Sequence, residues 1–312
     1  MSMRQRSVLP PVFGSRKAVT PPRARKAAQR FVRPLKLFSW LLLVTLLCAT
    51  PVRAKWIFDI RSGVLYDSNV SRSDRSGDVE EGLAWRTFVA AGQQFQLTDD
   101  LRLGLFAETE ARVWQTYDGL DSVAPAFAPN LRYRFGLGKN APWLRLETKV
   151  GYADFAEARR SGWDARAGVR GGFSLSDRLA LEAGYLFSDF AARDTVFCLQ
   201  AHALSVRGSL ELTSSTRLAL GYEYRYGDVN SHAVPPRPEI VAIADALIPV
   251  NTFDELRTAY RFEASTHSGS VALSQALGSF AAVQARYVFE YTTHDPVQYT
   301  NHVAELAIAF SF

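Results

Sequence analysis

The stretch of sequence that decides the fold is LRLGLFAETEARVWQTY, from Leu101 to Tyr117. Apolar and polar residues alternate along it. Side chains of a β-strand point in turn to opposite faces of the sheet, so this period of two predicts a strand with one apolar and one charged face. The apolar face carries Leu101, Leu103, Leu105, Ala107, Ala111 and Val113, and the polar face carries Arg102, Glu108, Glu110 and Arg112.

The same period recurs through the rest of the chain. Short turns alternate with longer polar loops between the segments, which is typical of an up-and-down barrel in a membrane. An even number of strands places both ends of the barrel domain on one side. We expect about 12 strands, at 56–66, 82–97, 101–117, 130–138, 143–155, 163–175, 179–190, 201–212, 218–227, 258–277, 280–291 and 300–312.

A soluble β-sandwich would also alternate, with its apolar faces turned to a core. The predicted strands are longer than the roughly five or six residues usual in soluble sheets. Aromatic residues stand near the ends of the apolar faces, as in the interfacial girdles of membrane barrels. The predicted fold class is therefore all-β, a transmembrane antiparallel up-and-down β-barrel. The expected girdle residues are Trp56, Trp85, Tyr117, Trp143, Trp163, Tyr226 and Tyr291.

Residues 1–54 differ in composition from the rest, because they are rich in Lys and Arg and contain no Asp or Glu. The apolar run Leu37–Cys48 is too short for a membrane-spanning helix and is followed by small Ala54, which fits signal-peptidase cleavage after Ala54. We interpret 1–54 as a basic presequence with a signal peptide that is removed, and 55–312 as the barrel domain. A start site placed too far upstream explains the unusual length of the basic stretch. An organelle transit peptide and a lipidated Cys48 are alternative interpretations.

Removal of residues 1–54 would change the net charge of the protein from positive to negative. The whole chain has a formal charge of +5, but the remainder holds more acidic than basic residues. The basic isoelectric point therefore does not indicate a nucleic-acid partner.

The last seven residues, Leu306–Phe312 (LAIAFSF), resemble the C-terminal strand signal of Gram-negative outer-membrane β-barrel proteins. That resemblance implies an outer-membrane location with both termini in the periplasm. It also implies contact with outer-membrane lipid and lipopolysaccharide, and recognition by the barrel assembly machinery through Phe312. A weaker likeness, at Tyr66–Val70 (YDSNV) and Asp295–Asn301 (DPVQYTN), is to barrels of exopolysaccharide export and of surface lipoprotein assembly modifiers.

If the apolar faces meet lipid, the charged faces line the interior. On the third to sixth predicted strands this inward set is mainly basic, which suits a water-filled conduit for polysaccharide or other polar or anionic solutes. Basic rings of this kind resemble those of twelve-stranded channels for acidic oligosaccharides. The alternative is an Arg–Glu network that fills a narrow barrel. The candidate lumen residues are Arg102, Arg112, Arg132, Arg134, Arg145, Lys149, Arg166, Arg170, Glu108 and Glu147.

Two loops carry further hypotheses. The apolar stretch within 228–255 either folds inward as a constriction or packs on the rim as a lid. Loop 67–81 is rich in Asp and Glu, and we expect it to be a solvated acidic loop, with a divalent cation near lipopolysaccharide as the alternative.

Two functions besides a conduit remain open. One is a closed barrel that engages a surface partner through its loops. The other is a lipid hydrolase, in which His202 would act with Ser205, or His267 with Ser265. The sequence contains no HExxH, G-x-S-x-G, P-loop or CxxC motif, so we expect no enzyme, no cofactor and no metal site.

Overall fold

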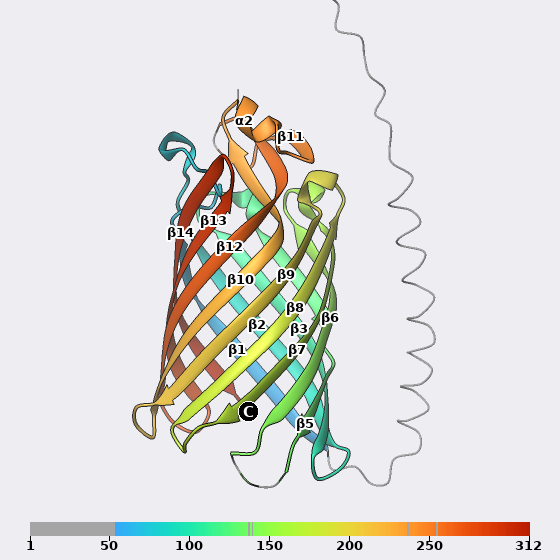
Figure 1. The fold of residues 1–312 in the computed structure, drawn as a ribbon, viewed down its shortest axis with the longest axis vertical. Coiled ribbons are helices and arrows are strands. Elements are labelled where there is room, and N and C mark those ends of the chain that lie inside the picture. The colour runs from blue at the N-terminus through green and yellow to red at the C-terminus, as the bar shows by residue number, and fades with distance from the viewer. Residues whose placement is uncertain (1–53, 137, 139, 236, 254) are drawn as a thin grey trace, which may run out of the picture. The chain divides into compact units, whose positions relative to one another are not determined.

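The computed structural model describes residues 54–312, apart from positions 137, 139, 236 and 254. This part of the chain is a closed antiparallel barrel with twelve strand positions and two extra strands, as the alternation predicts. Figure 1 shows its strands running obliquely around the barrel. The strands are β1 (Ala54–Asp67), β2 (Gly82–Gln96), β3 (Leu101–Trp114), β4 (Ser122–Phe127), β5 (Asn130–Arg134), β6 (Trp143–Phe155), β7 (Gly162–Ser174), β8 (Leu179–Ala192), β9 (Leu199–Glu211), β10 (Thr216–Ala233), β11 (Ala246–Val250), β12 (Arg257–Ala276), β13 (Ala281–His294) and β14 (Val297–Ser311).

The barrel closes where β1 pairs with β14, for example at Ile60 opposite Phe310. The last residue takes part, since the Phe312 N–H donates to the Phe58 carbonyl at 3.0 Å. Closure leaves no free sheet edge, which a strand in lipid cannot tolerate. Leu146 of β6 is 51% exposed on the outer surface, whereas the charged residues that alternate with it are half-buried inside.

One strand position is divided. We expected a polar loop at 118–129, but β4 occupies Ser122–Phe127 and pairs with both β3 and β6, and β5 continues the same position. Pro125 and Pro129 have no N–H to donate to a ladder, which explains why this segment reads as a loop. The long loop expected between the predicted strands 280–291 and 300–312 is also wrong, because β13 ends at His294 and β14 begins at Val297.

We call the end with the short turns the inner end and the end with the longer loops the outer end. Three-residue 3-10 turns lie in four of the outer loops, and a short helix lies in the longest. These elements are η1 (Ser76–Asp78), η2 (Asp118–Leu120), η3 (Ala158–Arg160), η4 (Thr195–Phe197) and α2 (Pro238–Val241).

Most of the expected girdle residues lie on the outside. Trp56, Trp85 and Trp163 are each more than half exposed, and Tyr226 is 45% exposed. Two expectations were wrong. Tyr117 is buried among the outer loops, and Trp143 lies inside the barrel, where the Arg132 guanidinium stacks on its ring at 4.5 Å.

The predicted presequence, its cleavage after Ala54 and the apolar run Leu37–Cys48 concern residues outside the described part, except that β1 begins at Ala54. Within the described residues, no helix is long and apolar enough to cross a membrane.

Candidate functional site: the lumen and its outer cap

The outer mouth of the barrel is crossed by the segment between β11 and β12. It leaves from the β10–β12 side, yet the Phe253 ring packs on Tyr117 of the β3–β4 loop with centroids 5.1 Å apart. In the strand order, β3 and β4 are diametrically opposite β10 and β12. Val250 and Phe253 are almost fully buried. The expected loop 228–255 is shorter in the structure, because β10 continues to Ala233 and β11 occupies Ala246–Val250. The segment after β10 spans the mouth, and we call it, with the loops it contacts, the outer cap (68–81, 115–121, 156–161, 193–198 and 234–256).

The acidic loop 67–81 is held within this cap instead of being solvated. The Arg237 guanidinium, 1% exposed, pairs with Asp74 at 2.7 Å and Asp78 at 3.1 Å, and with Glu239 at 2.7 Å. Burial acts to lower the pKa of Arg237, but its hydrogen bonds with Asp74 and Glu239 outweigh burial and raise that pKa above its ordinary value. Arg257 pairs with Glu80 of the same loop.

A second polar cluster joins the cap to the β6–β7 loop. Arg160 contacts Glu157 at 3.0 Å and His232 Nε2 at 2.8 Å. Since Nδ1 of His232 faces the Ser71 carbonyl, which only accepts, Nδ1 carries the proton and Nε2 accepts from Arg160. Burial acts to raise the pKa of Glu157, but the Thr252 hydroxyl and Arg160 outweigh it and hold that pKa below its ordinary value.

Apolar clusters fill the space between these polar contacts. Ile240 of α2 is fully buried against Tyr260 and Phe262 of β12 and Tyr299 of β14. Three successive residues of β10, Ser231 to Ala233, are also buried, so both faces of this end of β10 are covered. The described residues of the outer cap therefore form a packed structure over the mouth.

Below the cap, one wall of the lumen is lined by ion pairs. We call the inner surface of β2–β7 the paired wall. Glu147 binds Arg145 at 3.2 Å and Arg170 at 3.0 Å, and Lys149 lies 3.5 Å from Glu108. The register places these residues side by side, with Arg145 opposite Arg170 and Lys149 opposite Arg166.

The other predicted lumen residues are also largely occupied. Arg112 pairs with Glu110, which also binds Arg86 at 2.7 Å, and Arg166 pairs with Asp164. Arg134 approaches Asp100 at 4.0 Å. Arg102 donates to Gln96, and Arg132 lies on Trp143. The charges of the paired wall are thus mostly neutralised locally.

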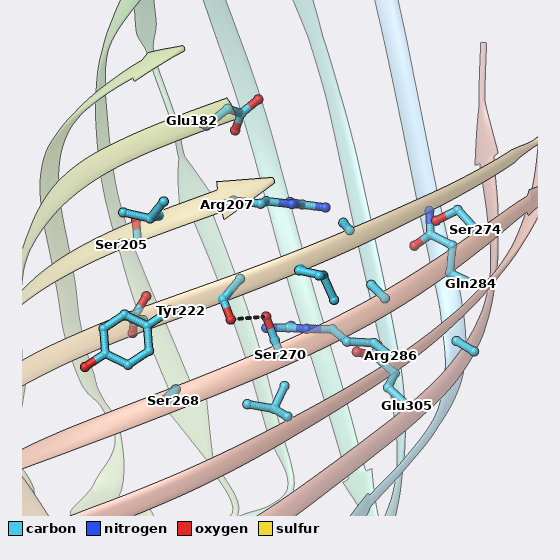
Figure 2. Close-up of a pocket in the computed structure, with 18 of the residues that line it drawn as sticks. Glu182, Ser205, Arg207, Tyr222, Ser268, Ser270, Ser274, Gln284, Arg286 and Glu305 are labelled. Atoms are coloured by element: carbon cyan, nitrogen blue, oxygen red, sulfur yellow. Dashed lines mark hydrogen bonds between the residues drawn. The ribbon is translucent and has the colours of Figure 1, made fainter. Parts of the chain in front are cut away.

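The opposite side of the lumen holds a cavity of about 460 Å³. Its wall, the inner surface of β8–β10, β12–β14 and the adjoining β1, has short side chains such as Ser205, Ser268, Ser270 and Ala272, and we call it the open wall. Figure 2 shows Arg207 and Arg286 projecting into this space from different strands.

The arginines of this cavity are exposed to it. Arg61, Arg207 and Arg286 are exposed although they point inward, and none of them forms an ion pair with another described residue. Arg286 lies within electrostatic range of Arg207, Arg61 and Arg86, with Glu305 as the opposing charge. Glu305 is already bound by Arg86 at 3.3 Å. Carboxylates share this cavity, which is also lined by Glu182, Glu223, Glu290 and Glu305. Glu182 stands opposite Arg207 and Glu305 opposite Arg286 in the strand register, so these arginines face carboxylates without forming ion pairs with them.

Of the predicted lumen residues, only Arg170 lines this cavity. The count of charges per strand predicted the site on the more basic wall, but that count does not include the ion-pair partners of those charges. The feature of the sequence that indicates the cavity is a set of small side chains at inward positions. Ser205, Ser268, Ser270, Ala272 and Ser274 occupy inward positions of β9 and β12, so the space lies where the wall is thin.

The hydrolase hypothesis gains no support from the geometry of its candidate pairs. Ser205 lines the lumen, whereas His202 is an odd number of residues away and bonds outside to Tyr185. Ser265 bonds to Tyr224 and His267 to Tyr222. No serine hydroxyl is hydrogen-bonded to a histidine ring in residues 54–312 as described.

Comparison with solved structures finds the same architecture. An outer membrane channel from Pseudomonas putida F1 superposes with a TM-score of 0.57 at 10% identity, covering 85% of this chain and 97% of that one. The chain has an outer-membrane β-barrel fold. At this identity the match supports the fold alone.

Two looser similarities are to the NanC porin (TM-score 0.46, 12% identity, 81% of this chain and 98% of that one) and the KdgM porin, solved with disordered oligogalacturonate (TM-score 0.39, 10% identity, 82% and 99%). Neither superposes closely enough to support an argument about this chain. No protein-family model matches the sequence, and no curated protein matches it either.

Proposed function

We propose that this chain is an outer-membrane conduit for small polar, anionic solutes, with solute passing along the open wall. The observation that carries this proposal is the cavity with Arg61, Arg207 and Arg286, three exposed inward cations without an ion-pair partner among the described residues. A buried charge without a counter-ion is costly unless water reaches it. The arrangement is best explained by a wet lumen, because the cavity also holds Glu182, Glu223, Glu290 and Glu305 and none of the three arginines is in ion-pair contact with them. We propose that these guanidinium groups bind anions such as sugar acids or carboxylates as they pass.

The location follows from the same proposal. Exposed aliphatic and aromatic residues surround the barrel, and its two ends both lie at the inner end. The inner end would face the periplasm, and the terminal Phe312 would be available to the assembly machinery during insertion. We expect signal peptidase to remove the presequence by cleavage after Ala54. We also expect the apolar surface to contact lipid and lipopolysaccharide.

The predicted basic residues have a supporting role in this scheme. Arg102 and Arg132 of the paired wall form no ion pair with a carboxylate of the described residues, and they lie toward the inner end, near Gln96 and Trp143. We propose that they guide anions inward, while Arg112, Arg134, Arg145, Lys149, Arg166 and Arg170, with Glu108 and Glu147, mainly brace the wall.

The test is planar-bilayer recording of the refolded barrel domain, residues 55–312. A conduit gives stepwise current, and its reversal potential in a salt gradient shows a preference for anions. Absence of steps in both the intact protein and a variant with a loosened cap would overturn the proposal. A cation preference would overturn its anionic part.

A second function is favoured by one observation, the dense packing of the outer cap. If the cap does not open, the barrel is a scaffold that presents its outer loops to a surface partner. Permanent closure in the recordings, together with unchanged current after the cap is loosened, would support this alternative over the conduit.

A further inference from the structure

Three histidines on the outer surface of the barrel share one local arrangement. In each, a tyrosine hydroxyl lies against the histidine Nδ1, at 2.7 Å for Tyr185 and His202, 2.8 Å for Tyr222 and His267, and 2.7 Å for Tyr287 and His302. Each histidine also stands directly opposite the aromatic residue two places after its tyrosine. These residues are Phe187, Tyr224 and Phe289.

The three pairs lie at one level of the barrel. Following the ladder across from His202 leads to Tyr226 and then Ser265, and His267 is two residues further toward the inner end. Following it from His267 leads to Tyr291 and Thr300, and His302 is again two residues further. Strands in a barrel are tilted, so a constant step of this kind keeps a feature at constant height.

Each pair leaves one polar atom facing outward. When the tyrosine donates its O–H to Nδ1, Nε2 carries the proton of the neutral ring and remains a donor. No described residue bonds to Nε2 of His302. A donor on the lipid-facing surface is satisfied at the level where lipid headgroups meet the barrel, which is also where amphipathic tyrosines collect.

The Tyr287–His302 pair differs from the other two because an apolar groove of about 530 Å³ lies beneath it. Ala285 and Ala304 are the short residues of this groove, and larger apolar side chains stand around them. Those lining residues are Val64, Val271, Leu273 and Leu306, with Tyr66 and Tyr287 toward the outer end. A groove of aliphatic side chains on a surface that faces lipid fits an acyl chain.

An acid also stands near the outer end of the groove. The Tyr66 hydroxyl donates to Glu81 Oε2 at 2.6 Å. The groove therefore has a hydrogen-bond donor, His302 Nε2, and a carboxylate, Glu81, associated with its two tyrosines. A headgroup with both a phosphate and a primary ammonium complements this pair of groups.

We propose that the groove beneath the Tyr287–His302 pair is a specific phospholipid site. One acyl chain lies over Ala285 and Ala304, the phosphate accepts from His302 Nε2, and the ammonium of an ethanolamine headgroup pairs with Glu81. The site is independent of the lumen, so its failure and the failure of the conduit are separate results.

The test is native mass spectrometry of the barrel domain released from detergent micelles doped with either dioleoyl phosphatidylethanolamine or dioleoyl phosphatidylglycerol. The two decisive variants are His302→Phe, which removes the donor, and Ala285→Leu, which fills the groove. Their matched controls are His202→Phe and Ala183→Leu, at the equivalent positions of the Tyr185–His202 pair. Heat-dependent mobility in SDS shows that each variant is folded, and Ala304→Val replaces Ala285→Leu if the latter does not fold.

We expect a phosphatidylethanolamine adduct that falls at least about fivefold in His302→Phe and Ala285→Leu and persists in both controls. Equal loss in the controls would overturn the site. An equally strong phosphatidylglycerol adduct would overturn the headgroup assignment. A dimer of the wild-type chain that Ala285→Leu abolishes, without a lipid adduct, would show that a second copy occupies the groove instead.

Discussion

The arginines of the outer cap and those of the open wall differ in burial and in ion pairing. Arg237 and Arg257 are almost fully buried, and each is bound to carboxylates of loop 67–81. Arg207 and Arg286 are exposed inside the barrel and have no such partner in the described chain. The difference shows that partners and water, and not residue type, separate an arginine that holds the fold from one that is free to meet a solute. The predictions below test this contrast.

The largest effect is expected from Arg237→Ala. Removing one member of a buried ionic cluster leaves its carboxylates uncompensated and costs about 3–5 kcal/mol. We expect the cap to loosen, with open-channel current rising at least about tenfold in planar bilayers and protease reaching residues 234–256.

Arg75→Ala is the matched control, because Arg75 pairs with Glu239 at 2.6 Å but is more than half exposed. Such surface pairs contribute roughly 0–1 kcal/mol. If both variants behaved alike, the buried cluster would not be what closes the mouth.

Next in size is the effect of Arg207→Glu combined with Arg286→Glu. Reversing a charge beside a passing ion changes its energy by on the order of 1 kcal/mol each in a watery lumen. The anion-to-cation permeability ratio, from reversal potentials, should fall about tenfold. Arg193→Glu in an exposed outer loop should change it little, and an unchanged ratio in the double variant would remove the open wall from the account.

On the paired wall, Glu147→Gln should act on stability more than on selectivity. It leaves Arg145 and Arg170 without their shared carboxylate, at a cost of about 1–3 kcal/mol. The temperature at which the barrel loses its compact mobility in SDS should drop. Glu182→Gln, which removes a lumen carboxylate outside the described ion pairs, should leave that temperature nearly the same.

The smallest expected effect is a dependence of the open-channel current on pH. The pKa of Glu157 is lowered in the cap, so its contribution to cap stability is complete above the unfolded value of about 4.3 and is lost as pH falls through the lower folded value. Open-channel current should rise modestly as pH falls below about 4. Glu157→Gln should remove this step, and its persistence in that variant would assign it to another carboxylate.

Much of this structure could be predicted from the sequence. Alternation at Leu101–Val113 indicates which side chains face lipid, and the structure keeps this orientation. The inward position of Trp143 could also have been predicted, because Trp143 lies on the same face of the strand as Arg145 and Glu147. Pro125 and Pro129 concealed β4 because prolines weaken the strand signal.

The partners of the lumen charges could not be predicted. Arg86 pairs with Glu305, far away in the sequence, and only closure of β1 on β14 brings them together. The cap is similar, since Phe253 and Tyr117 come from opposite sides of the barrel. A count of charges per strand cannot predict how β1 pairs with β14 or which loops meet across the mouth.

The central claim is that the open wall is wet and attracts anions while the cap is dry. It can be measured directly by introducing a single cysteine in a Cys198→Ala background, at Ser270 on the open wall or at Ser231 in the cap. Each variant is treated with sulfonate-bearing and trimethylammonium-bearing methanethiosulfonates, with rates normalised to a free thiol. We predict that Ser270→Cys reacts, and faster with the anionic reagent, while Ser231→Cys is protected. Protection of Ser270→Cys, or faster reaction with the cationic reagent, would contradict the account.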